Sequence, residues 1–109
     1  MEKALEDKIR YHHLFDIYGV LLTEKQKKAF EYHYLDDYSL SEIASLLNVS
    51  RNAVYEQITI ATTYLDEYET KLGLLAKSEK STKIIEQLKA LNNQNPEMQK
   101  LIQELEKLE

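Results

Sequence analysis

The side chains of this chain that could perform acid–base or metal chemistry are three histidines and two neighbouring aspartates. His12, His13 and His33 form neither a Glu-x-x-His nor a His-x-x-x-His pattern, and the chain has no cysteine. Asp36 and Asp37 directly precede a serine that suits the start of a helix, a place where aspartates usually form a turn. The two glycines stand far apart, so no glycine-rich loop could hold a phosphate group. We therefore expect no enzyme, no metal site and no cofactor.

A second group of side chains has the chemistry of nucleic-acid recognition. Arginine can bind guanine and asparagine can bind adenine, each through two hydrogen bonds, and one of each follows Ser50, a good helix cap. Three lysines on a preceding helix form the densest positive cluster, and helices in that position often contact phosphates. The candidate DNA-contacting residues are Arg51, Asn52, Tyr55, Glu56, Thr59, Lys25, Lys27 and Lys28. The alternative for both sets is an ordinary solvated helix surface.

These candidates depend on two helices and a tight turn, which we predict within residues 38–55. Ser39 and Glu42 have the spacing of a capping box, in which each side chain accepts a hydrogen bond from the backbone N–H of the other residue. The apolar residues expected to face the core are Ile43, Leu46 and Leu47. This pattern predicts a short helix that starts at Ser39.

The turn is predicted around Val49. Asn48 follows the last apolar position, and asparagine tolerates the left-handed backbone that ends a helix. We expect Val49 to plug the turn and Ser50 to cap the second helix. Two helices joined by so short a turn form a helix-turn-helix motif. The alternative is a plain pair of helices inside a helical core.

Apolar periodicity predicts two helices before this motif and a long second helix within it. We expect the first over residues 3–21, and the next to start at Thr23 with Gln26 completing a capping box. The long helix should run from Arg51 to about Leu72. Its expected buried stripe is Val54, Ile58, Ala61, Leu65, Tyr68 and Leu72.

Two shorter helices are predicted near the C-terminus, after a polar stretch at residues 77–81. Residues 92–95 should separate them, with Asn95 capping the last helix and Pro96 at its first position. The expected fold class is therefore all-α, with a helix-turn-helix domain over residues 1–75. A helical hairpin over residues 76–109 should serve packing or dimerisation.

Several apolar side chains lie outside the stripes that one small core can bury, which predicts a homodimer. The two short helices cannot bury their apolar faces alone, and the long helix carries further apolar residues beside its stripe. The candidate interface residues are Ile60, Tyr64, Ile84, Ile85 and Leu88.

Composition limits the class of protein further. The chain has 109 residues, which suits one small domain with an appended arm, and 43% hydrophobic residues, which allows a core. No apolar run approaches the roughly 20 residues of a membrane span, and the charged N-terminus does not resemble a signal peptide. We expect a cytoplasmic protein without membrane contact. Its formal charge of −5 requires its cations to gather on one face if it binds DNA.

Separate blocks of this sequence resemble the YlxM family in order. They are Leu21-Leu-Thr-Glu-Lys-Gln, Tyr32-x-Tyr-x-Asp-Asp-Tyr-Ser-Leu-x-Glu-Ile-Ala, Val49-Ser-Arg-Asn-Ala-Val-Tyr and Tyr68-Glu-x-Lys-Leu. The resemblance implies an all-helical, dimeric DNA-binding protein whose helix-turn-helix is similar to region four of sigma factors. It also implies a regulatory link to the signal recognition particle, because the family's genes often adjoin those of that particle's protein and its receptor. The family often has a Lys-Arg pair after the position of Ile58, where this chain has Thr59 and Ile60.

Two functions from different classes follow. The first is recognition of double-stranded DNA by a dimer. The second is a protein-interaction module of the signal recognition particle pathway, with little or no DNA binding. The acidic charge favours the second, and the Ser50-Arg51-Asn52 helix start favours the first.

Overall fold

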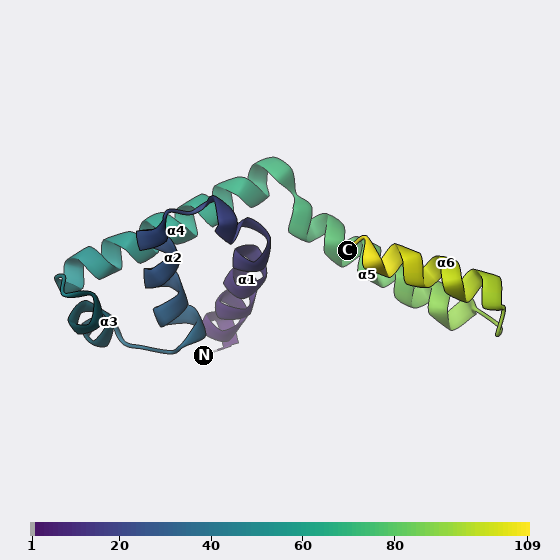
Figure 1. Cartoon of the computed structure of the whole chain (residues 1–109), viewed down its shortest axis with the longest axis horizontal. Helices are drawn as coiled ribbons and strands as arrows, with labels where there is room; N and C mark the ends of the chain where they lie inside the picture. Colours follow the sequence, from purple (N-terminus) through teal and green to yellow (C-terminus); the bar gives the residue numbers. More distant parts are fainter. Residues whose placement is uncertain (1) are drawn as a thin grey trace. The chain divides into compact units, whose positions relative to one another are not determined.

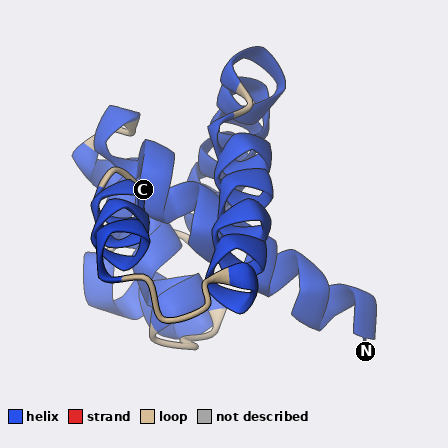
Figure 2. Cartoon of the chain, turned by 90° about the vertical axis from the view of Figure 1, so that its right-hand side faces the viewer, coloured by secondary structure: helices blue, strands red, loops and turns tan. Residues whose placement is uncertain are grey.

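The computed structural model describes the backbone of residues 2–109 and the side chains of residues 5–109, so Met1 of the expected first domain lies outside it. All regular elements of this part are helical and none is a strand, which confirms the all-α fold class (Figure 1). They are α1 (Glu2–Tyr18), η1 (Gly19–Leu21), α2 (Glu24–Phe30), η2 (Glu31–Leu35), α3 (Leu40–Leu47), α4 (Arg51–Leu72), α5 (Leu74–Leu91) and α6 (Pro96–Lys107). Figure 2 shows the short loops that join them. Contacts divide the chain into two compact units, residues 1–72 and 73–109.

The first unit is built on α4, which contacts α1, α2 and α3 (Figure 1). One stripe of α4 is buried and includes Val54, Ile58, Ala61 and Leu65, as the periodicity predicts. The residues buried against it come from all three shorter helices: Leu14, Tyr18, Ala29, Phe30 and Ile43. Burial of this stripe leaves the opposite side of α4 exposed to solvent.

The predicted helix starts before the turn are both present. Thr23 Oγ1 accepts a hydrogen bond from Gln26 N at 3.2 Å, and Gln26 Oε1 accepts one from Thr23 N at 2.9 Å. Ser39 and Glu42 form the same reciprocal pair, with both distances 3.1 Å. These side chains satisfy N–H groups that a helix start leaves without a backbone partner.

The turn of the helix-turn-helix has the backbone that its sequence predicts. Asn48 ends α3 in the left-handed conformation, with φ 56° and ψ 48°. Ser50 Oγ then accepts a hydrogen bond from Ala53 N at 3.0 Å and so caps α4. The direction of the chain is therefore fixed on both sides of Val49 by local contacts.

Three residues expected to be inside the core are exposed instead. Leu46 is 58% exposed, because α3 has only eight residues and buries a narrow strip around Ile43. Val49 is 47% exposed and lies at the surface of the turn, so the prediction that it plugs the turn was wrong. Leu72 is 57% exposed, because it is the last residue of α4.

The first helix ends earlier than expected. α1 stops at Tyr18, and η1 follows as a 3-10 turn that starts at Gly19. A Cβ on Gly19 would lie 3.0 Å from the ring of Phe15, so a larger residue there would require this ring to shift by a few tenths of an ångström. Only the C-terminal half of α1 reaches the core, and therefore Leu5 and Ile9 remain exposed.

Histidines on the apolar faces have hydrogen-bond partners, as expected for structural residues. His12 Nε2 lies 2.7 Å from the carbonyl oxygen of Tyr34, and His33 Nδ1 lies 3.1 Å from that of Tyr38. Tyr34 belongs to η2, a π-helical turn that joins α2 to the loop before α3. The His12 contact attaches η2 to α1, and the His33 contact holds the loop before α3 against η2.

In the second unit, α5 begins directly after Gly73, which has the left-handed φ of 63°. The expected polar break at residues 77–81 is absent, since lysine and glutamate are good helix formers and polarity alone does not end a helix. The predicted break at residues 92–95 is present, and Asn95 Oδ1 accepts hydrogen bonds from the N–H groups of Glu97 and Met98. α5 and α6 thus form a helical hairpin around the buried Ile85 and Ile102.

The left-handed backbone at Asn48 makes a test of the turn. We expect Asn48→Ala to lower the free energy of unfolding by about 1 kcal/mol, because alanine has no polar side chain that could offset the steric cost of the left-handed backbone by a local hydrogen bond. Asn48→Gly should be neutral or stabilising, because glycine has no Cβ and pays no such steric cost. Urea denaturation of the three proteins measures this. Ser45→Ala, at an exposed position inside α3, is the control and should not destabilise. Equal stability of the glycine and alanine variants would contradict the assigned backbone.

A contact between α1 and α4 predicts a dependence of stability on pH. Burial, together with the hydrogen bond from Tyr11 to Asp66 Oδ2 at 2.8 Å, raises the pKa of Tyr11 from 10.0 to about 12. The unfolded chain therefore loses this proton first, and the stability that it contributes disappears as the pH rises from 10 towards 12. Urea unfolding should show a shallower decline over this interval for Tyr11→Phe than for the wild type. Tyr55→Phe, which removes an exposed phenol of α4, should keep the wild-type decline.

Candidate nucleic-acid interface

The exposed side of the first turns of α4 carries five candidate residues. Arg51 and Asn52 are exposed at the start of the helix. Tyr55, which is 61% exposed, and Glu56 follow one turn later, and Thr59 lies beyond them. Side chains three or four positions apart share a face of a helix, so these five form one strip, here called the α4 strip. It offers the donors of an arginine and an amide, together with one carboxylate.

Beyond the α4 strip, helix α4 offers few hydrogen-bond donors to a ligand. Thr62 Oγ1 donates to the carbonyl oxygen of Ile58 at 3.1 Å, and Thr63 Oγ1 donates to that of Thr59 at 2.7 Å. A hydroxyl has a single proton to donate, so these threonines direct it to their own helix. Any recognition by α4 must therefore rely on its start.

Two of the three candidate lysines lie beside the start of α4. Lys25 and Lys28 are exposed on α2, and both line a surface groove together with residues of the turn and of α4. Lys27 is half-buried, and its Nζ lies 3.6 Å from Glu24 Oε1, outside this group. The structure thus brings Lys25 and Lys28 together with the turn, and it separates Lys27 from them.

Cations are scarce in the first unit, and several are paired. Residues 1–72 contain eight Lys and Arg residues against thirteen Asp and Glu residues, a net charge of −5. Lys8 pairs with Asp37 and lowers the pKa of that carboxyl, and Arg10 Nη2 lies 3.5 Å from Asp66 Oδ1. No ion pair among the described side chains includes Lys25, Lys28 or Arg51. These three cations remain available to an external anion.

The groove beside the α4 strip was not expected from the sequence. It has a volume of about 290 Å³ and lies between α2, the turn and α4. Its lining includes Lys25, Lys28, Leu47, Val49, Ala53 and Gln57. Ala53 faces away from the centre of the core and is only half-buried, which leaves space next to Val49. A small residue beside an apolar turn residue was the one signal of this groove in the sequence.

Comparison with known proteins places this architecture in a family. A family model described as "Putative helix-turn-helix protein, YlxM / p13 like", UPF0122, matches residues 5–105. The chain belongs to the UPF0122 family. The resemblance of the sequence blocks to the YlxM family is thereby confirmed.

Relatives of this UPF0122 protein match nearly its whole length. A UPF0122 protein of Halalkalibacterium halodurans is 48% identical over 108 residues, which cover 96% of this chain and 99% of the relative. One of Bacillus licheniformis is 47% identical over 106 residues, which cover 97% and 99%. One of Geobacillus kaustophilus is 44% identical over 109 residues, which cover 96% and 99%.

The candidate interface residues of this UPF0122 protein differ in accessibility. Ile60 is half-buried on α4, and Tyr64 is 42% exposed and stacks on Tyr68 with ring centroids 6.1 Å apart. In the second unit Ile84 is 52% exposed and Leu88 is half-buried. Ile85 is buried within a single chain, with 6% exposure, so it cannot offer a surface to a partner. The expectation for Ile85 was wrong because adjacent residues of a helix point about 100° apart, so Ile85 is buried within the hairpin while Ile84 stays exposed.

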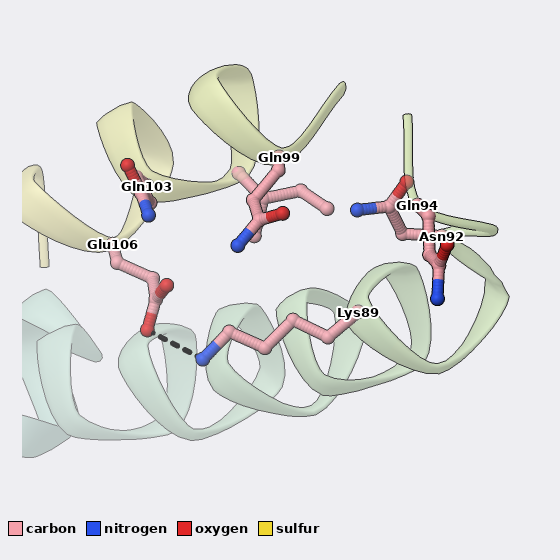
Figure 3. Close-up of a pocket in the computed structure, with 7 residues that line it drawn as sticks. Lys89, Asn92, Gln94, Gln99, Gln103 and Glu106 are labelled. Atoms are coloured by element: carbon pink, nitrogen blue, oxygen red, sulfur yellow. Dashed lines mark hydrogen bonds and ion pairs between the residues drawn. The ribbon is translucent and has the colours of Figure 1, made fainter. Parts of the chain in front are cut away.

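A hollow of the second unit lies between α5 and α6, next to the loop that joins them. It has a volume of about 430 Å³, and Figure 3 shows Lys89 and Glu106 joined across it by an ion pair of 2.8 Å. The other polar lining residues are amides: Asn92, Gln94, Gln99 and Gln103. Amide side chains do not ionise near neutral pH, so Lys89 and Glu106 are the only ionisable side chains among the described residues that line the hollow. Their hydrogen bond raises the pKa of Lys89.

The described residues contain neither a cluster of metal ligands nor a membrane-spanning helix. Within residues 5–109, no three His, Cys, Asp or Glu side chains lie where they could share a metal ion. No helix among the described residues has the length and apolar character needed to cross a membrane.

Proposed function

We propose that this UPF0122 protein binds double-stranded DNA through the start of α4, as a regulatory homodimer in the cytoplasm. The observation that carries the proposal is the position of Arg51 and Asn52, which are exposed at the capped start of α4. Lys25 and Lys28, the unpaired lysines of α2, lie beside the same turn. In helix-turn-helix proteins the start of the second helix contacts base edges while neighbouring elements contact phosphates.

The chemistry of the surface assigns different roles to its residues. Arg51 and Asn52 can each form two hydrogen bonds with a base edge in the major groove, and Tyr55 and Glu56 follow them on the same strip. The partial positive charge at a helix N-terminus also attracts a phosphate. The rest of the unit is acidic, so the few cations must supply most of the attraction through release of counterions.

Salt dependence tests this proposal directly. Binding to random duplex DNA should weaken steeply with salt, because each neutralised phosphate contributes about 0.9 to the logarithmic slope. The double variant Lys25→Gln, Lys28→Gln should reduce the slope by about 2, and fluorescence anisotropy measures it. Lys71→Gln, which removes an exposed cation from the far end of α4, is the control and should keep the slope.

The same assay separates base contacts from phosphate contacts. On duplexes selected from a random pool with the wild-type protein, Arg51→Ala or Asn52→Ala should cost about 1–3 kcal/mol of discrimination against random DNA. Absence of salt-sensitive binding by the wild-type protein would contradict the DNA-binding function.

The exposed apolar residues of the hairpin support a homodimer. They include Ile84, Leu91, Met98, Leu101, Leu105 and Leu108, all at least 42% exposed. Monomeric soluble proteins seldom leave a large apolar patch uncovered, and a dimer carries two recognition helices. Successive major grooves are about 34 Å apart, so the two copies of Arg51 should have that spacing.

Sedimentation velocity tests the dimer. The wild type should sediment as a dimer, and Ile84→Glu combined with Leu101→Glu should shift it to a monomer, since the charges would be desolvated in the contact. Lys83→Glu, at an exposed polar position next to Ile84, should leave the dimer intact. A wild-type monomer at the concentrations used for DNA binding would refute the dimer while leaving the DNA proposal testable.

The net charge of −5 supports a second candidate function, a protein-interaction module of the signal recognition particle pathway. Here the helix-turn-helix is a scaffold, and the contacts are made by Ile60, Tyr64 or the hairpin. Components of the particle are the partners that the family resemblance suggests. This function requires no salt-sensitive DNA binding, so the salt titration distinguishes the two.

A further inference from the structure

The groove beside the turn has an apolar floor that no residue of the first unit fills. Val49 exposes 47% of its surface there, and the half-buried Leu47 and Ala53 line the groove with it. Phosphate contacts of a duplex need cations and N–H groups, and they leave apolar surface without a partner. DNA binding at the α4 strip therefore does not account for this floor.

The rim of the groove is cationic. Lys25 and Lys28, one helical turn apart on α2, line one side, and none of the described side chains that line the groove is a carboxylate. Neither lysine is in an ion pair with a described residue, although the first unit has an excess of five negative charges. The combination of an apolar floor and an unpaired cationic rim selects a ligand that is both apolar and acidic.

The size of the groove limits its occupant. Its volume of about 290 Å³ lies just under the range of roughly 300–1,000 Å³ that is typical of small-molecule pockets, and the groove is open at the surface. It suits one or two bulky apolar side chains that project from a larger chain. Amphipathic helices bind in this way, with apolar residues three or four positions apart entering a groove.

We propose that the groove binds an acidic amphipathic helix of another protein. A leucine-sized side chain of that helix enters between Val49 and Ala53, and its flanking carboxylates pair with Lys25 and Lys28. Because the same lysines contact phosphates in the proposed function, the helix and duplex DNA compete for this protein. This last consequence, unlike the docking itself, depends on DNA binding.

A synthetic helical peptide tests the docking. The probe is a fluorescent 14-residue peptide with leucines at positions i, i+3, i+4 and i+7 and glutamates at the flanking positions. Val49→Ser and the double variant Lys25→Glu, Lys28→Glu should each bind it about tenfold more weakly than the wild type. Val20→Ser, at a valine that is 77% exposed elsewhere, and Lys71→Glu should change the affinity less than about twofold.

Two further peptides identify the interaction. The same peptide with serine in place of leucine should bind at least about tenfold more weakly; equal binding would mean simple attraction of charge and would overturn the proposal. The peptide with lysine in place of glutamate should not bind, and binding by it would also overturn the proposal. If Val49→Ser sedimented as a monomer where the wild type sediments as a dimer, a second copy of this chain would fill the groove. That result would contradict binding of a helix from another protein.

Competition separates this inference from the DNA-binding proposal. Arg51→Ala should lose DNA discrimination and keep the peptide, whereas Val49→Ser should lose the peptide and keep DNA. The leucine–glutamate peptide should displace duplex DNA from the wild type but not from Val49→Ser. Failure of DNA binding with intact peptide binding would refute only the proposed function. Failure of the peptide with intact DNA binding would refute only the groove.

Discussion

The burial of one stripe of α4 is the contact on which the first unit depends. This side of the helix packs into the core formed with α1, α2 and α3 through Val54, Ile58, Ala61 and Leu65. Since a helix has a fixed angular period, this packing also decides which residues of α4 face solvent. The exposure of Arg51 and Asn52 is a consequence of packing on the opposite side, and it needs no separate interaction to hold these side chains outward.

Sequence patterns predicted the features that are completed within a few residues. Both capping boxes, the left-handed Asn48 and the cap by Ser50 form because each side chain meets a backbone group of its own turn. The same holds for Asn95 and Pro96 at the start of α6. These helix ends depend only on residues close together in the sequence, so the sequence was sufficient to predict them.

Features that depend on distant contacts were predicted less well. Leu46 and Val49 have apolar side chains at helical spacing, yet no element of the first unit covers them, and their exposure follows from how little of α3 meets α4. The groove had no direct pattern, because its walls come from α2, the turn and α4. The sequence also predicted a break at the polar residues 77–81, whereas α5 continues through them. Polar residues there mark a solvated helix face and do not end the helix.

The distribution of cations explains how an acidic unit keeps one electropositive site. Lys8, Arg10 and Lys27 lie 4 Å or less from carboxylates of their own unit, so their charge is largely used within the fold. Lys25 and Lys28 stand apart from these pairs at the edge of an apolar groove. A low-dielectric wall strengthens the field of a neighbouring charge, and two lysines there are worth more to an anion than the same two on a fully solvated helix. Net charge alone is therefore a poor guide to what this face can bind, because it does not show which cations remain outside ion pairs.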